Sequence, residues 1–369
     1  MKKVKLGEVC EILSGYAFKS SQFNDKKIGL PLIRIRDVER GFSDTYFEGA
    51  YPEEYLIKNG DLLITMDGSF ILKKWEGDLA LLNQRVCKIK ITDKSVDEGY
   101  IAWMIPKFLK EIEDKTPFVT VKHLSVAKIK DISFVLPNKL EQKLISKKLN
   151  TISQIYDFRK IQSEELNELV KSRFNEMFGS KKFDKVSISE LVDDRIETAK
   201  KKFDQHDTIK YIDISSIDNK NYKMTGFQEY MLNQAPSRAQ QHIRKGDIVV
   251  STVRPNLKNI AITELDDENL VASSGFCVLR ALKCLPEYLF AIICSDRFTN
   301  KMTNIVTGAN YPAIKSSDIM NYIVPLPPIQ LQNEFADYVA KVDKSQLAIQ
   351  KSLEELETLK KSLMQDYFG

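Results

Sequence analysis

The segment 325–369, PLPPIQLQNEFADYVAKVDKSQLAIQKSLEELETLKKSLMQDYFG, holds the pattern that decides the fold. After its prolines, mostly apolar side chains recur with alternating gaps of four and three residues, which is the spacing of a coiled-coil seam. The segment therefore predicts a helix of about 40 residues, about 60 Å long at roughly 1.5 Å per residue. The seam positions are Phe335, Val339, Val342, Gln346, Ile349, Leu353, Leu356, Lys360, Leu363 and Tyr367.

An earlier segment follows the same plan at a constant offset of 190 residues, which aligns Leu136-Pro137 with Leu326-Pro327 and Phe178-Gly179 with Phe368-Gly369. Its seam is weaker in the middle, where Ile155, Phe158 and Ile161 form a neighbouring stripe. A helix cannot bury such a seam alone, so we expect the two helices to pair with each other, antiparallel; pairing with another subunit is the alternative. The seam positions of this first helix are Ile145, Leu149, Ile152, Tyr156, Arg159, Ser163, Leu166, Val170, Arg173 and Met177.

The repeat extends into the mixed sequence before each helix. Residues 58–65 resemble residues 244–251, and residues 4–9 resemble residues 186–191. Short β-branched runs bounded by Gly, Asp or Asn predict strands, and longer periodic stretches predict helices. The predicted strands are 62–64, 86–91, 248–250 and 276–279, and the predicted helices are 100–112 and 287–302.

These patterns predict an α+β fold with two similar mixed α/β domains, related by a pseudo-two-fold axis and joined by an intramolecular antiparallel coiled coil. The expected division is a first domain at 1–137, a first helical region at 138–180, a second domain at 181–327 and a second helical region at 328–369.

Composition narrows the class of protein. The chain has 369 residues, 43% hydrophobic and 29% charged, which is typical of a soluble globular protein. Neither a membrane span of roughly 20 apolar residues nor a signal peptide is visible, so we expect a cytoplasmic protein without membrane contact. The net charge of +4 permits nucleic-acid binding if the cations gather on one face. The five cysteines form no CxxC pair, which predicts reduced, mostly buried thiols.

No catalytic constellation is visible in the sequence. There is no GxxxxGK[ST] phosphate loop, and the one Pro-Pro pair, Pro327-Pro328, lies in a linker and not in an adenine-methylation motif. No proline precedes an aspartate, which removes the commonest form of a nuclease motif. The histidines His123, His206 and His242 lack metal-ligand spacing. We therefore predict no catalytic residue and no metal site.

Several motifs occur in order and in both halves. The first set is Thr120-Val121-Lys122-His123-Leu124, Ile129-Lys130-Asp131-Ile132, Leu136-Pro137 and Glu141-Gln142; the second is residues 307–314, Asp318-Ile319, residues 325–328 and Gln332; residues 82–86 and 246–255 add two more. Together they resemble, over essentially the whole chain, the specificity subunits of Type I DNA restriction-modification enzymes. Asn138-Lys139 and Leu331-Gln332 depart from the family pattern.

The resemblance implies a non-catalytic subunit that binds double-stranded DNA at a two-part, asymmetric target with a spacer set by the helices. It also implies recruitment of two methyltransferase subunits and of restriction subunits. S-adenosylmethionine, ATP and Mg²⁺ are implied for those partners, and no cofactor is implied for this chain.

Sequence-specific DNA binding needs cations for phosphates and Arg, Asn or Gln side chains for base edges. Such residues gather after predicted strands and turns. Arg34 and Arg36 alternate with apolar neighbours, so one polar face of a strand is an alternative interpretation for them. The predicted contacts are Lys19, Arg34, Arg36, Lys73, Lys74, Asn83, Gln84, Arg85, Arg238, Gln240, Gln241, His242, Arg254, Asn256, Lys258, Asn310 and Tyr311.

Three rival hypotheses remain open. The first is a binding module of the same fold that acts outside restriction, or a spare recombination partner that lacks its own methyltransferase. The second is a nuclease or methyltransferase with unfamiliar motifs. The third is a structural coiled-coil protein, which leaves the two mixed domains without a purpose.

Overall fold

The fold repeats one plan in two units. The computed structural model describes residues 2–116, 122–179, 182–193, 195–307 and 312–369. Unit 1 comprises Met1–Arg159 and Ser352–Gly369, and unit 2 comprises Lys160–Lys351. Each long helix therefore contributes one part to each unit, whereas the expected four-part division treats the helices as separate regions. That division stays a prediction.

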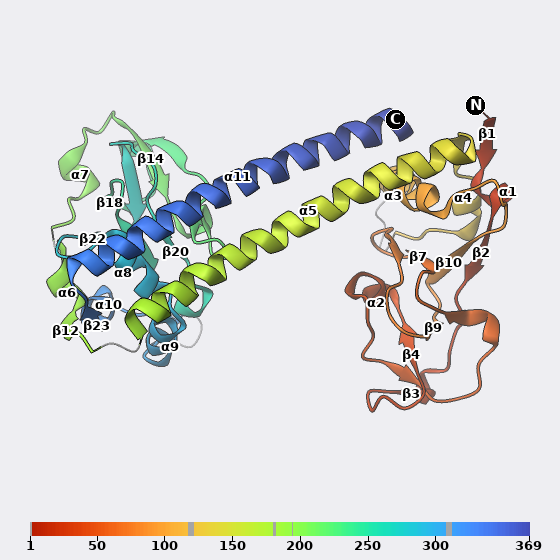
Figure 1. Ribbon diagram of the computed structural model, residues 1–369, viewed down its shortest axis with the longest axis horizontal. Helices are drawn as coiled ribbons and strands as arrows, with labels where there is room; N and C mark the ends of the chain where they lie inside the picture. Colours follow the sequence, from red (N-terminus) through yellow and green to blue (C-terminus); the bar gives the residue numbers. More distant parts are fainter. Residues whose placement is uncertain (1, 117–121, 180–181, 194, 308–311) are drawn as a thin grey trace. The chain divides into compact units, whose positions relative to one another are not determined.

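Unit 1 is built on two small sheets (Figure 1). The predicted strands at 62–64 and 86–91 form neighbours in the first sheet, and the second sheet contains a parallel pair. The first has the order β2(Cys10–Ser14), β10(Val86–Ile91), β7(Leu62–Thr65), β8(Leu72–Lys74); the second has the order β3(Phe23–Asn24), β5(Tyr46–Phe47), β4(Leu30–Ile33), β9(Ala80–Leu82), β6(Leu56–Ile57). A separate pair joins β1(Lys2–Lys5) to β11(Ser133–Leu136), and the helices are α1(Leu6–Val9), α2(Ile35–Arg40), α3(Glu98–Lys115) and α4(Val126–Lys130).

Unit 2 repeats this plan with equivalent pairings in the first sheet, but its second sheet has four strands and no counterpart of β3. Its first sheet has the order β13(Val192–Asp193), β22(Phe276–Ala281), β19(Ile248–Ser251), β20(Ile260–Ile262); its second has the order β17(Gln228–Met231), β14(Thr208–Ile212), β21(Leu270–Ser273), β18(Ala239–His242). Strand pairs β12(Asp184–Ser187) with β23(Ile323–Leu326) and β15(Ile217–Asp218) with β16(Lys223–Met224) complete it, together with α6(Ile188–Leu191), α7(Ala199–Lys202), α8(Pro286–Ile293), α9(Asp296–Asn304) and α10(Ser316–Met320).

All four predicted strands are confirmed, and the predicted helix at 100–112 lies within α3. The single helix predicted at 287–302 is wrong, because two helices, α8 and α9, occupy the stretch. Ser295 explains the break. Its hydroxyl accepts a hydrogen bond from the backbone N–H of Phe298 at 3.2 Å, which starts a new helix.

The thiols match the prediction. All five cysteines are free, and four of them are buried. Burial raises the pKa of Cys87 to about 12 and that of Cys277 to about 11, so both thiols stay protonated at neutral pH. None of the described helices is both long and apolar enough to cross a membrane.

The long helices α5(Lys139–Phe174) and α11(Ile329–Phe368) pair within the chain. In unit 2, Gln346 donates to Asn167 at 2.6 Å, and the ring of Phe335 lies 5.5 Å from that of Phe174. Residue numbers thus rise along α5 while those of their partners fall along α11, so the pairing is antiparallel. The expected fold class is confirmed, and pairing with another subunit is not needed to cover the seams.

Every predicted seam position on both helices is buried or half-buried. A second apolar face on α5 remains exposed, and we call it the α5 stripe. It consists of Leu140, Leu144, Ile155, Phe158, Ile161 and Leu169, which are 41–70% exposed. At about 100° per residue, these six side chains fall within an arc of about 120° on the helix. The neighbouring stripe noted in the sequence therefore faces solvent and not the seam.

The repeated Phe-Gly pair places one aromatic ring in each core. In unit 1, Phe368 at the end of α11 packs on Tyr100 of α3, with ring centroids 5.4 Å apart. In unit 2, Phe178, in the turn that follows α5, packs on Tyr288 of α8 at 5.0 Å. Both phenylalanines are at least 92% buried, and each burial contributes about 1.5–3 kcal/mol. Each helix is thus anchored at its far end in a domain core.

A buried glutamine fixes the beginning of each long helix. The Gln142 side chain accepts from the backbone of Asp97 at 2.8 Å and donates to the carbonyl of Pro137 at 2.8 Å. The Gln332 side chain accepts from the backbone of Leu285 at 2.9 Å and donates to the carbonyl of Pro327 at 2.9 Å. In each copy the buried amide is satisfied by one bond to the proline linker and one to the residue just before α3 or α8, so it holds these two segments together. This explains why a Gln follows the proline in both copies.

Unit 2 contains a buried ion pair whose loss we expect to be costly. Asp247 is 2% exposed at its side chain and lies 2.6 Å from the guanidinium of Arg280. Asp247→Ala leaves that cation buried and unpaired, so we expect the free energy of unfolding of unit 2 to fall by about 3–5 kcal/mol. Hydrogen exchange of β19 and β22 measures it.

The matching carboxylate in unit 1 provides the control. Asp61 is 19% exposed and lies 3.7 Å from Lys88, so Asp61→Ala is expected to cost less. Equal losses in the two variants would contradict the role given to burial.

Candidate nucleic-acid interface

Three loops meet at one edge of unit 1. Strands β4 and β9 are parallel, so the residues that follow them emerge at the same edge. The N–H of Asn83 donates to the carbonyl of Ile33 at 3.2 Å, and that of Tyr16 donates to Leu82 at 3.0 Å. Gly15 permits this approach, because a Cβ there would lie 2.1 Å from the carbonyl oxygen of Asn83. The loops near Lys19, Arg34 and Arg85 are therefore brought together.

Arg85 lies at the tip of this arrangement. Its φ of 72° is in the left-handed region, which non-glycine residues rarely adopt. Its guanidinium Nε lies 3.4 Å from Asp67, and its side chain is 53% exposed. His123 contacts the same carboxylate at 2.6 Å. Arg85 is among the contacts predicted from the sequence, whereas Asp67, which follows β7, is not.

Arg34 and Arg36 do not continue a strand, and that interpretation is wrong. Strand β4 ends at Ile33, and α2 begins at Ile35. The reason is Asp37, whose carboxylate accepts from the N–H of Arg34 at 3.1 Å and caps the helix. Asp37 is fully buried and lies 3.5–3.7 Å from the guanidinium groups of Arg34, Arg36 and Arg40.

Arg40 was also missed in the sequence. It stacks 4.2 Å above the ring of Phe42, which is 52% exposed. Arg36, 60% exposed at its side chain, remains open to a phosphate, whereas Arg34 is engaged by Thr45 and Asp37. The cluster around Asp37 thus concentrates positive charge beside the three loops.

Other predicted contacts in unit 1 differ in their availability. Lys19 and Gln84 are exposed in the converging loops. Asn83 is 6% exposed, so its side chain faces inward and does not present itself to a base edge. Lys73 donates to the carbonyl of Glu39 at 2.7 Å, and Lys74 lies 3.4 Å from Glu98.

In unit 2 the loop after β21 meets the segment before β18 and the loop after β19. The N–H of Ser274 donates to Arg238 at 2.8 Å, and that of Thr252 donates to Gly275 at 3.0 Å. Arg254, two residues further on, has a φ of 49°, so it also lies in the left-handed region. Strain of this kind costs about 1–3 kcal/mol and clusters at functional sites. Exposed side chains at this edge are Arg238, Gln240, Arg254 and Asn256.

Gln241 and His242 face the interior of unit 2. The Gln241 amide donates to the carbonyls of Ser273 and Phe276, both at 2.9 Å. His242 is 8% exposed and contacts the carbonyl of Glu268 at 3.1 Å, and burial lowers its pKa. The sequence grouped them with their exposed neighbours; a register shift between Ala239 and Gln241 breaks the regular alternation of β18, and the hydrogen bonds of both side chains within the unit remove them from the interface.

Two further predictions have different outcomes. Lys258 lies 2.5 Å from Asp296 and is 24% exposed, so it braces α9 against the loop after β19. Asn310 and Tyr311 lie outside the described residues, as do Thr120 and Val121 of the first-half motif. Among the residues that the structure describes, no group of His, Cys, Asp or Glu is arranged to hold a metal ion.

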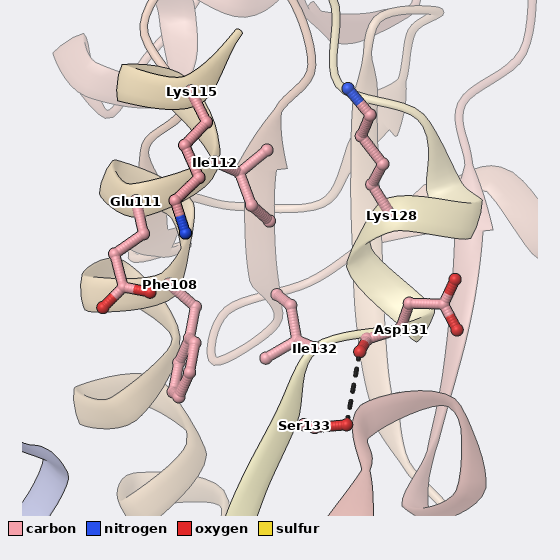
Figure 2. A pocket seen from close by; sticks show the side chains of 8 residues that line it. All are labelled: Phe108, Glu111, Ile112, Lys115, Lys128, Asp131, Ile132 and Ser133. Atoms are coloured by element: carbon pink, nitrogen blue, oxygen red, sulfur yellow. Dashed lines mark hydrogen bonds between the residues drawn. The ribbon is translucent and has the colours of Figure 1, made fainter.

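A surface pocket of about 300 Å³ in unit 1 belongs to a different region (Figure 2). Figure 2 shows side chains of α3 on one side and Lys128 of α4 on the other, with Ile112 and Ile132 between them. Its lining contains none of the predicted DNA contacts, so we do not assign it to the interface.

Comparison with known proteins identifies the family of the chain. A family model described as Type I restriction modification DNA specificity domain matches residues 1–168 and 180–359. The specificity subunit of the Type I restriction enzyme EcoBI from Escherichia coli is 28% identical, with 99% of this chain and 85% of the relative aligned. That of the enzyme MjaVIII from Methanocaldococcus jannaschii is 23% identical over 85% of this chain and 79% of the relative.

The fold has a solved counterpart as well. It is the crystal structure of a Type I restriction-modification system S subunit from M. genitalium. The match spans 100% of this chain and 96% of the M. genitalium chain, with a TM-score of 0.62 and 13% sequence identity. At that identity the likeness concerns the fold alone. The two family matches cover most of the sequence, one for each repeat, and the chain therefore belongs to the family of Type I restriction-modification DNA specificity subunits.

Proposed function

We propose that the chain reads a two-part, asymmetric DNA target, one part with each unit. One observation carries the proposal: the loops after β7 and β9 meet as those after β19 and β21 do, but the side chains that they present differ. Thr65 pairs with Val86 as Ser251 pairs with Phe276, so the frameworks match residue by residue. Different side chains on matching frameworks favour two different half-sites.

The long helices are proposed to set the spacer between the half-sites. They contain 36 and 40 residues, so each is about 54–60 Å long at roughly 1.5 Å per residue. Their ends are fixed by buried contacts at Phe178, Phe368, Gln142 and Gln332. Bases between the half-sites are then left unread.

Partners are proposed to supply the catalysis. Two methyltransferase subunits dock on the helices, one of them on the α5 stripe, because a large exposed apolar face is typical of a protein–protein interface. Restriction subunits join the assembly in the cytoplasm, where it meets DNA. S-adenosylmethionine, ATP and Mg²⁺ are bound by those partners, and this chain contributes recognition.

Arg254→Ala tests the assignment of unit 2 to one half-site. The exposed guanidinium stands at the converging loops, so its loss is expected to cost about 1–3 kcal/mol of binding to targets with an intact half-site for unit 2. The loss is measured from the affinity of the methyltransferase complex for duplexes in which one half-site at a time is altered.

Lys245→Ala is the matched control, because that exposed lysine lies at the opposite end of β19. An equal loss on every DNA sequence in the Arg254 variant would show a phosphate contact and contradict the assignment.

A further inference from the structure

A three-residue cluster in unit 1 fixes the position of one guanidinium. Asp67 Oδ2 lies 3.4 Å from Nε of Arg85, and Asp67 Oδ1 lies 2.6 Å from Nδ1 of His123. Asp67 is 22% exposed at its side chain, whereas Arg85 and His123 are 53% and 48% exposed. The carboxylate therefore lies beneath the other two groups and holds them toward solvent.

The distances decide which nitrogen of His123 carries a proton. Nδ1 has two neighbours, Asp67 at 2.6 Å and Nη1 of Arg85 at 3.4 Å. A carboxylate only accepts hydrogen bonds, so the shorter contact requires a proton on Nδ1. Nδ1 is then no acceptor for Arg85, whose orientation depends on Asp67.

The backbone at Arg85 adopts a strained conformation, which places the side chain next to Asp67. Arg85 has a φ of 72°, and its carbonyl accepts from the N–H of Met66 at 2.9 Å. In unit 2 the equivalent bond runs from Thr252 to Gly275 at 3.0 Å. Gly275, at the equivalent position, has no left-handed φ, so the strained conformation is particular to Arg85. Such strain persists where the surroundings enforce it, and it points to function.

The other two members are also missing from unit 2. Asp67 forms a bridge with His123, and Val253 forms the corresponding bridge with Ala313. The N–H of Leu124 donates to Met66 as that of Ile314 donates to Thr252. The positions of Asp67, His123 and Arg85 are therefore held by Val253, Ala313 and Gly275. The cluster is a feature of unit 1 and not a requirement of the fold.

We propose that Arg85 reads a guanine in the half-site bound by unit 1, with Asp67 as its positioning residue. This deepens the proposed function and rests on it. Arginine pairs with O6 and N7 of guanine through two parallel hydrogen bonds, which requires a fixed guanidinium plane. The half-buried carboxylate also opposes a phosphate at the same place, so the cluster favours the neutral edge of a base over the backbone.

Substitutions at both residues test the proposal in the methyltransferase complex. For Arg85→Ala, we expect discrimination at one guanine of the unit 1 half-site to fall about 5- to 150-fold, with the other half-site unchanged. Arg85→Lys should not restore it, because lysine is a point charge without the planar fork. Asp67→Asn should weaken the same discrimination while binding to unrelated DNA rises.

Lys110→Ala serves as a control, since that exposed cation is paired with Asp114 on α3 and is not among the predicted DNA contacts. Duplexes with each base of the half-site changed in turn, measured at two salt concentrations, give the readout. The proposal would be overturned if Arg85→Ala lost the same binding affinity on all DNA sequences, or if its affinities did not change. If wild-type complex recognises no split target, the proposed function itself fails; if it does and Arg85→Ala keeps the guanine preference, only this inference fails.

Discussion

Duplicating seven residues in phase in each long helix is expected to lengthen the unread spacer of the DNA target by about one to three base pairs. The insertion adds about 10.5 Å at roughly 1.5 Å per residue, close to three base steps of about 3.4 Å. It turns the helix by only about 20°, whereas each added base pair turns the DNA by about 35°, so affinity should fall as well. Mapping methylated adenines in cells that carry the variant gives the spacer length.

The duplicated stretches are residues 157–163 and 349–355. On α5, the first stretch lies between Lys148 and Asn167. On α11, the second lies between Gln346, which contacts Asn167, and Tyr367, which contacts Lys148. A variant with the α5 duplication alone is the control, because it places the seams out of register and should lose activity. An unchanged spacer in the double variant would contradict the idea that the helices set the distance.

Phe158→Glu is expected to weaken association with the methyltransferase about 30-fold or more, the loss typical of a central interface residue. Phe158 is 69% exposed at the middle of the α5 stripe, so the substitution leaves the seam intact but places a charge where an apolar partner would pack. Co-purification and titration of the two proteins measure the change.

Glu164→Lys is the matched control for this prediction, because that exposed residue lies about 120° around the helix from Phe158. The circular dichroism of both variants should equal that of wild type. Undiminished association of the Phe158 variant would mean that the methyltransferase docks elsewhere.

The long helices were predictable because their signal is local and periodic. The seam repeats every three or four residues, and side chains such as Val342 and Ile349 are buried as that spacing requires. The Phe-Gly repeat also pointed to equivalence of the two halves. Its role did not follow from the pattern, because the ring of Phe368 packs on Tyr100, which is distant in sequence.

The site was harder to predict because its partners are distant or inward-facing. Asp67 and His123 are 56 residues apart and meet only through the fold. Arg34 alternates with apolar residues like a strand, but a single cap by Asp37 turns the chain into α2. His242 belongs to a polar run, yet its ring is buried in unit 2 after a register shift in β18. Aligning residues 58–65 with 244–251 and extending the match two positions would have found Asp67 opposite Val253.

Genome-wide mapping of methylated adenines, with and without this chain beside its methyltransferase, tests the central claim most directly. Two unlike reading units joined by paired helices predict a motif of two short, different blocks separated by a constant number of unread bases, and its disappearance when the chain is removed. A single uninterrupted motif, or a methylation pattern that does not depend on this chain, would contradict the account.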